Sequence, residues 1–307
     1  MRKIVLVLLV ALLGVPAASA REERVEADCA ATSVGLSPLT DLGGGRYHGY
    51  RGGLYANGKN VPPKTYAKTG LARAKAVKPI DGKTVLLSIG MSNTTQEFSA
   101  FKRIADADAR KNPALTIVDG AQGGQDAEIV KDPNARFWTV VEQRLRAASA
   151  TAAQVQAVWL KEAIARESSP FPADAKRLKG DLAAIVGVLR ARFPNLRLVY
   201  VSSRTYGGYA STPLNPEPFA YDSGFAVKWL VADRIAGRLK GPWVAWGPYL
   251  WTNGEKGRKD GLAWTCADTR ADGTHPSASG QQKVAQLLLR FFTTDATARP
   301  WFVKPAA

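Results

Sequence analysis

Histidine is scarce in this chain, and one of its two histidines stands three residues after an aspartate. The segment Asp272-Gly273-Thr274-His275-Pro276 has the composition of a turn, and His48 is the only other histidine. On such a turn a carboxylate can hold one imidazole nitrogen, which leaves the other nitrogen free to remove a proton. The segment therefore predicts that His275 is a general base oriented by Asp272. A histidine with only a structural role is the alternative.

A serine stands where a nucleophile would be placed. The segment Gly90-Met91-Ser92-Asn93 directly follows an apolar run, Thr84–Ile89. A serine on a strand-to-helix turn presents its hydroxyl at the edge of a sheet, and its own N–H can stabilise an oxyanion. The position favours a nucleophile, although a serine that only caps a helix would occupy the same place.

A glycine-rich segment, Asp119–Gln125, follows a second apolar run in the same way. Glycines allow the backbone to approach a bound group closely and to donate N–H groups to it. The segment lacks the Lys-Ser/Thr pair of a phosphate-binding loop and the spacing of a dinucleotide fingerprint. It predicts either a backbone donor site or a plain turn.

Strands that alternate with helices must position these segments. We expect strands at residues 84–89, 115–118, 155–160, 196–201 and 244–246, and helical stripes at residues 137–145, 182–193, 221–239 and 284–291. Asp174 and Ser279 are the expected helix caps. The alternation predicts an α/β fold, a three-layer α/β/α sandwich around a mainly parallel five-stranded sheet. In such sheets the active site lies at the carboxyl ends of the strands, which is where the serine and the glycine-rich segment fall. The Asp272–Pro276 segment lies near the end of the chain, before the last expected helix.

In their order and positions the three segments resemble the SGNH (GDSL-type) hydrolase family, whose sheet is flavodoxin-like. The resemblance spans Thr84 to about Phe292, and Asp272–Pro276 is its most specific part. It implies that Ser92 is the nucleophile of a serine esterase and that Asp272 and His275 complete the triad. It further implies an oxyanion hole formed by the N–H groups of Ser92 and Gly124, and no cofactor. Two departures are Met91, where the family usually has Asp, and Asp119, where it usually has Asn.

A third departure concerns the block that follows the third strand. The family has Gly-x-Asn there, or Gly-Glu in its carbohydrate-esterase branches, whereas Ala157–Ala163 contains neither Gly nor Asn. Lys161 or Glu162 then occupies the site, and the charge of Lys161 makes it the candidate oxyanion donor. Loss of one such donor lowers rates about 10²–10³-fold in other acyl-transfer enzymes. A catalytically weakened relative is therefore the alternative function.

Aromatic residues on the expected loops are candidates for stacking on sugar rings. Tyr206 and Tyr209 follow the fourth strand, and Trp251 lies beside Asn253-Gly254. Together with Asn93, next to the expected nucleophile, they are the predicted substrate-binding residues. The alternative is that the aromatic side chains pack their loops onto the core.

The first twenty residues have the pattern of a secretory signal peptide. Arg2-Lys3 is followed by an apolar run, Ile4–Leu13, and by the small residues Ala18-Ser19-Ala20. About ten apolar residues are too few to span a bilayer, so an uncleaved anchor is the less favoured interpretation. We expect a secreted or periplasmic protein. In an oxidising compartment Cys29 and Cys266 would form a disulfide, with two free thiols as the alternative.

Residues 21–80 are dense in glycine and proline, for example at Gly43–Gly45 and Pro62-Pro63. This composition predicts an irregular lead-in, without a helix, that packs over the core. Residues 81–307 then form the hydrolase-like domain.

The chain is strongly basic, with 42 Lys and Arg against 26 Asp and Glu, a formal charge of +16 that would be +14 without the first twenty residues. Two Cys and two His are too few for a zinc finger or an iron–sulfur cluster, and no metal site is expected. The charge suits acidic polymers or surfaces.

The predicted function is a secreted serine esterase that hydrolyses an acyl ester, such as acetyl, on a carbohydrate or cell-envelope polymer. The weakened relative would instead bind an anionic glycan or surface through its basic residues. Nucleic-acid binding would rest on charge alone, and export argues against it. Stable membrane insertion is not expected either, and the sequence does not indicate an oligomeric state.

Overall fold

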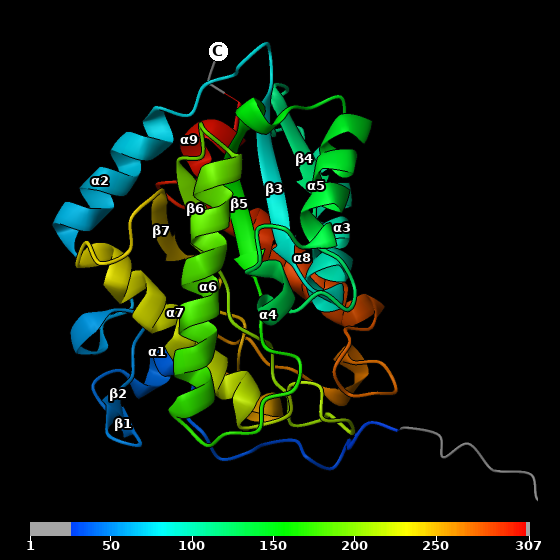
Figure 1. Cartoon of the computed structure of the whole chain (residues 1–307). Coiled ribbons are helices and arrows are strands. Elements are labelled where there is room, and N and C mark those ends of the chain that lie inside the picture. Colours follow the sequence, from blue (N-terminus) through cyan, green and yellow to red (C-terminus); the bar gives the residue numbers. More distant parts are fainter. Residues whose placement is uncertain (1–25, 305–307) are drawn as a thin grey trace, which may run out of the picture.

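A five-stranded parallel sheet forms the centre of the computed structural model, which describes residues 26–304 (Figure 1). The predicted signal peptide lies outside the described residues. The strand order is β4-β3-β5-β6-β7. The strands are β3 Thr84–Gly90, β4 Leu115–Asp119, β5 Val155–Lys161, β6 Leu198–Val201 and β7 Trp243–Trp246. The α/β fold prediction is confirmed, because each apolar run becomes a strand. In β3 and β5 every residue is buried, as expected for strands covered on both faces.

Helices cover both faces of the sheet. Figure 1 shows α6 and α7 in front of the strands and α8 behind them. α3 packs against α8, and α6 packs against α7, so the molecule has the predicted three layers. The long helices are α3 Ser92–Asp106, α5 Arg136–Ala147, α6 Ala173–Arg192, α7 Phe219–Ile235 and α8 Ala278–Thr294.

Both predicted helix caps are wrong. α8 begins one residue after Ser277, whose side chain accepts a hydrogen bond from the N–H of Gly280, so Ser279 already lies inside the helix. α6 begins after Pro172, and Asp174 therefore lies in its first turn. The Asp174 carboxylate instead accepts the N–H groups of Ser168 and Ser169, each at 2.7 Å, and so fixes the preceding turn.

The lead-in contains a helix, contrary to the prediction. α2, Lys64–Lys75, begins directly after Pro63, where proline ends the irregular chain without interrupting the helix. Its one glycine, Gly70, lies flat on the Trp243 indole, since a Cβ there would come within 2.4 Å of the ring. The irregular, glycine-rich part of the lead-in therefore ends before α2. The single glycine inside the helix allows close packing against Trp243 of β7.

The lead-in packs along the β7 edge of the sheet. The Tyr66 hydroxyl donates to the carbonyl oxygen of Val244 at 2.7 Å, and the Trp246 indole N–H donates to the carbonyl of Leu54 at 2.8 Å. The remaining short elements are α1 Leu39–Leu42, β1 Arg46–Tyr47, β2 Tyr50–Arg51, η1 Ala56–Gly58, α4 Ala127–Val130, η2 Ala152–Gln154, η3 Gly254–Lys256, η4 Cys266–Asp268 and α9 Arg299–Phe302.

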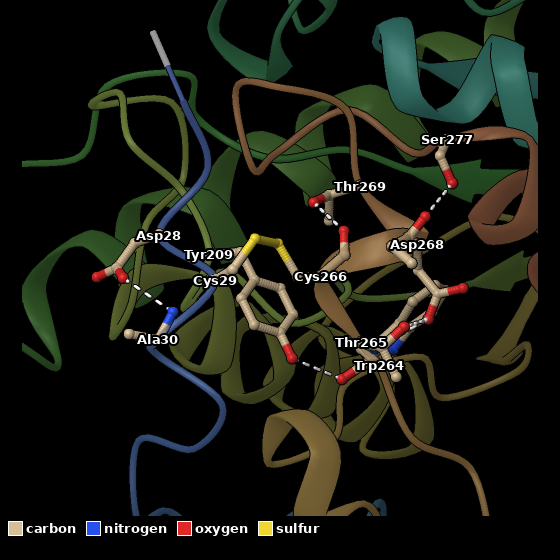
Figure 2. The surroundings of a disulfide bond; sticks show 11 residues. Asp28, Cys29, Ala30, Tyr209, Trp264, Thr265, Cys266, Asp268, Thr269 and Ser277 are labelled. Atoms are coloured by element: carbon tan, nitrogen blue, oxygen red, sulfur yellow. Dashed lines mark hydrogen bonds between the residues drawn. A yellow bond between two sulfur atoms is a disulfide. The ribbon is translucent and has the colours of Figure 1, made fainter.

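A disulfide joins Cys29, near the start of the described chain, to Cys266 in η4, with the two Cα atoms 5.3 Å apart (Figure 2). Tyr209 lies beside it. The Asp28 N–H donates to the Tyr209 carbonyl at 3.0 Å, and the Tyr209 hydroxyl donates to the Trp264 carbonyl at 2.9 Å. The disulfide thus links the N-terminal segment around Cys29 to the segment that leads into the Asp272–His275 turn.

Candidate active site

Ser92 is the first residue of α3 and directly follows the end of β3. Met91, which precedes the helix, has extended backbone and supplies no side-chain cap. The first N–H groups of α3 therefore point out of the helix end, where the helix dipole favours negative charge. Gly90 makes the tight turn possible, because a Cβ there would come within 2.3 Å of the Lys161 carbonyl oxygen.

Ser92, His275 and Asp272 form a continuous hydrogen-bonded chain. The Ser92 hydroxyl oxygen lies 2.7 Å from His275 Nε2, and His275 Nδ1 lies 2.5 Å from an Asp272 carboxylate oxygen. The side chains of His275 and Asp272 are 22% and 28% exposed, so the imidazole is held by protein yet reachable from solvent. This arrangement can remove the serine proton during attack on a carbonyl and stabilise the imidazolium that forms.

The turn that carries the acid and the base is held by backbone bonds and by a glycine. The second Asp272 carboxylate oxygen accepts the N–H groups of Thr274 at 3.0 Å and His275 at 2.9 Å. Gly273 has φ +65°, and a Cβ there would lie 1.7 Å from the Tyr209 carbonyl oxygen. Only glycine fits this close approach in the left-handed region.

Asp272 is held in its ionised form. Burial alone would raise its pKa, but hydrogen bonds from the His275 ring and from the backbone N–H groups of His275 and Thr274 lower the pKa below the ordinary value of an aspartate. The carboxylate therefore keeps its charge beside the imidazole. Such a charge fixes the tautomer in which Nε2 accepts the serine proton.

The glycine-rich loop after β4 lies beside Ser92. The Gln122 N–H donates to the Gly90 carbonyl at 2.9 Å, and a Cβ built on Gly123 would lie 3.8 Å from Ser92 Cβ. Gly124 has φ +70° and open space around the position of a side chain. Among residues 26–304 no hydrogen-bond acceptor meets the N–H of Gly123 or Gly124. Both N–H groups are therefore free beside Ser92, and the oxyanion role of Gly124 stays a prediction.

Lys161 is not placed as an oxyanion donor, and that prediction is wrong. Its side chain is fully buried, and Nζ lies 2.6 and 2.5 Å from the two carboxylate oxygens of Glu97 on α3. Burial lowers the pKa of Lys161 to about 8, although Glu97 acts in the opposite direction. Because successive side chains of a strand point to opposite faces, Lys161 at the end of β5 faces α3. Its ion pair with Glu97 links α3 to the sheet. Glu162 is also buried, and burial raises its pKa well above the ordinary value.

The aromatic candidates for substrate binding are buried, which contradicts the prediction. Tyr206 is 3% exposed, while Tyr209 and Trp251 are fully buried. Their polar atoms bond within the protein: the Tyr206 hydroxyl donates to the Ala31 carbonyl, and the Trp251 indole N–H donates to Glu217 at 2.7 Å. The rings of Tyr206, Tyr209 and Trp251 pack edge to face, so they hold the loops onto the core.

Asn93 also has another role than the predicted one. It is 1% exposed, and its amide donates to the Thr274 carbonyl at 2.8 Å. It therefore joins the start of α3 to the histidine turn and positions the triad. The alternative prediction for Ser92, a serine that only caps the helix, is wrong, because its hydroxyl faces His275.

Arg204, which follows β6 by three residues and is 3% exposed, is a buried charge that was not among the predicted residues. The available signal was a charged residue three positions after an apolar run. In residues 26–304 no group of three or more His, Cys, Asp or Glu side chains is arranged to hold a metal ion. None of the helices in that same part of the chain is long and apolar enough to cross a membrane.

Comparison with known proteins gives structural neighbours only. No family model and no curated protein matches this sequence. A GDSL-like lipase from Bacteroides thetaiotaomicron is similar over 73% of this chain and 95% of its own, with 11% identity and a TM-score of 0.41. The periplasmic domain of a Salmonella ser. Paratyphi A lipopolysaccharide acetyltransferase is similar over 75% and 88%, with 14% identity and a TM-score of 0.41.

A third neighbour, from Bacillus subtilis, is similar over 69% of this chain, with 12% identity and a TM-score of 0.40. This chain covers 56% of the length of that protein. The identities and TM-scores are too low to assign an activity, and the chemistry of this chain rests on its own residues.

Proposed function

We propose that this protein is a serine esterase of the SGNH type that hydrolyses an acyl ester. The observation that carries the proposal is the chain of contacts from Ser92 to His275 to Asp272, at 2.7 and 2.5 Å. Three further features support it: the order of the serine, glycine-rich and aspartate–histidine segments along the chain, the unpaired N–H groups beside Ser92, and the ionised form of Asp272.

The reaction would proceed in two halves. The Ser92 oxygen attacks the ester carbonyl while His275 Nε2 takes the serine proton, and Asp272 stabilises the imidazolium. The N–H groups of Ser92 and Gly124 are the donors proposed for the oxyanion. His275 then gives its proton to the leaving alcohol. In the second half a water gives a proton to His275 as it attacks the acyl-serine carbonyl; His275 then returns that proton to the Ser92 oxygen as the C–O bond breaks, which releases the acid and the free serine.

We further propose export and a short acyl group, such as acetyl, on a carbohydrate or cell-envelope polymer. The signal-like pattern of residues 1–20 supports export, and the Cys29–Cys266 disulfide is typical of an oxidising compartment. A polar turn at the triad and a strongly basic chain suit a polymer that carries acidic groups.

The test compares the purified protein with Ser92→Ala on 4-nitrophenyl acetate and with a fluorophosphonate probe. We expect turnover and covalent labelling that Ser92→Ala abolishes. Ser211→Ala is a matched control, because Ser211 is exposed and contacts Asp272 only through its backbone N–H, which alanine keeps. A wild-type protein that neither labels nor exceeds Ser92→Ala on any short-chain ester would refute the esterase proposal.

A second candidate, binding of an anionic glycan, is favoured by the charge of the lead-in. Between Asp41 and Asp81 the chain has no acidic residue and eight basic ones. All eight are exposed, and none forms an ion pair with any of the described residues. They are Arg46, Arg51, Lys59, Lys64, Lys68, Arg73, Lys75 and Lys78. A surface of this kind can attract a polyanion without any catalytic step.

This candidate is tested by retention on immobilised polygalacturonate at increasing salt. If it holds, Lys64→Glu/Lys68→Glu/Lys75→Glu weakens retention, since these lysines lie along one side of α2. Retention should also fall with salt, because charge contacts are screened. Unchanged retention of the triple variant would reject the role of α2.

A further inference from the structure

A hollow of about 480 Å³ opens at the surface between the lead-in and two of the helices that cover the sheet. It is lined by Tyr50 of β2, by Lys176, Lys179 and Gly180 of α6, and by Trp229 of α7. Figure 1 shows α6 and α7 in front of the strands, and the two helices pack against each other. The volume lies within the range of about 300–1,000 Å³ that is usual for ligand sites. None of the five residues belongs to the triad or to the glycine-rich loop, so the proposed esterase chemistry does not use them.

Trp229 differs from the other tryptophans of the described chain. They are all buried, and each of them donates its indole N–H to an oxygen of the protein at a distance of 2.7–3.2 Å. Trp229 is partly exposed, and its indole N–H meets no acceptor in residues 26–304. An aromatic ring of this kind presents an apolar body and one free donor to a molecule that enters the hollow.

The aromatic wall of the hollow is fixed by packing. The ring centroids of Trp229 and Tyr50 lie 5.1 Å apart, and Phe171 lies 5.3 Å from Tyr50 and 5.8 Å from Trp229. Phe225 contacts Trp229 at 5.8 Å. The Tyr50 hydroxyl has no partner within the described residues, whereas the neighbouring Tyr221 hydroxyl donates to a backbone carbonyl at 2.8 Å. Packed rings therefore hold two free polar groups on this wall.

Lys176 supplies the charge of the hollow. It is exposed and forms no ion pair with any described residue. The other cations of this part of α6 are paired, since Lys179 Nζ lies 2.7 Å from an Asp233 carboxylate oxygen and Arg177 lies 3.1 Å from one of Asp174. No acidic residue lines the hollow. The unpaired ammonium therefore favours an anionic group in this place.

Gly180 leaves the hollow its space. It lies inside α6, where glycine is less favourable than alanine. A Cβ built on Gly180 would meet no atom within 4 Å, so close packing against another residue does not require this glycine. Because Gly180 lines the hollow, a side chain at this position would occupy it.

These groups together restrict the chemistry of a ligand. Aromatic rings that carry free polar groups suit a sugar ring, whose C–H groups pack on the rings and whose hydroxyls accept and donate hydrogen bonds. The ammonium adds a preference for a carboxylate on the same sugar. A membrane surface would need exposed apolar side chains. The large apolar side chains that are exposed in residues 26–304 are Val61 and Ile129, and neither lines the hollow.

We propose that Tyr50, Lys176 and Trp229 form a binding site for an acidic sugar residue of a polysaccharide. The proposal rests on the second candidate function, binding of an anionic glycan, and names the site and the class of sugar. It does not depend on the esterase reaction, because none of the three residues belongs to the triad.

The experiment is isothermal titration calorimetry at low salt with trigalacturonate and with maltotriose, a neutral sugar of the same length. We expect the wild type to bind trigalacturonate more tightly. Gly180→Leu fills the hollow and should lower the affinity for trigalacturonate by at least about 10-fold, because the sugar no longer reaches the wall. Gly187→Leu is the matched control, since Gly187 lies on the same helix with equally open surroundings but does not line the hollow. It should bind as the wild type does.

Two further variants test the wall and the charge separately. Trp229→Ala removes the ring and its donor and should lower the affinity for both sugars about 10-fold. Lys176→Gln should lower the affinity for trigalacturonate about two- to fivefold, the size of an exposed ion pair, and leave that for maltotriose unchanged. The melting temperature of each variant is measured as well. If Trp229→Ala does not fold, the comparison of the two glycine variants decides.

The outcomes separate this site from the candidate function on which it rests. Equal affinities of Gly180→Leu and Gly187→Leu would overturn the site. Wild-type binding of a peptide of three glutamates as tight as that of trigalacturonate would also overturn it, because charge alone would then explain the attraction. Retention of the wild type on polygalacturonate, with an unchanged affinity of Gly180→Leu, rejects the site and keeps the glycan-binding candidate. A wild type that is not retained and does not bind trigalacturonate rejects both.

Discussion

The ion pair between Lys161 and Glu97 gives the sharpest test of how the nucleophile is held. Lys161 ends β5, and Glu97 lies on α3, five residues after Ser92. Their side chains are 0% and 1% exposed, and both carboxylate oxygens contact Nζ. The Thr94 hydroxyl donates to the Lys161 carbonyl at 2.7 Å, which adds a second connection between the same two elements.

The size of the effect follows from this burial. Lys161→Met leaves the Glu97 carboxylate in the core without a partner, and such a loss costs about 3–5 kcal/mol. Glu97→Met leaves the ammonium alone at a similar cost. Replacing both residues by methionine removes both charges and keeps much of the volume, so the double variant should lie within about 1 kcal/mol of the wild type.

The assay is urea unfolding followed by tryptophan fluorescence, with the four proteins of the cycle measured at pH 7. Lys102→Met is the control, because Lys102 pairs with Asp106 on the same helix but at the surface, with 44% and 38% of the side chains exposed. That variant should change the free energy of unfolding by less than about 1 kcal/mol. Single variants that cost no more than the Lys102 control would refute the inference, as would a double variant whose loss equals the sum of the singles.

Three further predictions concern the triad, the disulfide and the buried carboxyls. Asp272→Asn should lower kcat by about 10⁴, because an amide favours the wrong imidazole tautomer, and an unchanged pH–rate profile with wild-type kcat would contradict the triad. Cys29→Ser/Cys266→Ser should reduce the free energy of unfolding by about 2–5 kcal/mol in urea, and no reduction would exclude a stabilising role of the bond. Glu167 has its pKa raised from 4.5 to about 8 by burial, so the folded protein keeps a proton that the unfolded chain releases. The free energy of unfolding should therefore fall as pH rises from about 5 to 8, by up to about 1.4 kcal/mol per unit, and Glu167→Gln should flatten this slope; an equally steep slope in the variant would show that other groups cause it.

The residues that touch each other in the triad could be predicted because their signals are local. Asp272 and His275 belong to one turn, and Ser92 is fixed by the strand that precedes it. A parallel sheet brings the carboxyl ends of its strands to one edge, which explains why Ser92 and the glycine-rich loop after β4 lie together. The apolar runs also placed all five strands, because strands buried on both faces need nearly continuous apolar sequence.

The sequence by itself therefore determined the α/β class, the strands and the three residues that form the hydrogen-bonded chain, Ser92, His275 and Asp272. Only the tertiary structure decided which way the other side chains face. Lys161 faces the core because Glu97 lies opposite it on α3. Trp251 is buried because its indole N–H donates to Glu217 and its ring packs against Tyr206 and Tyr221. The glycine inside α2 is explained only by Trp243, far along the chain, whose indole leaves no room for a Cβ at Gly70.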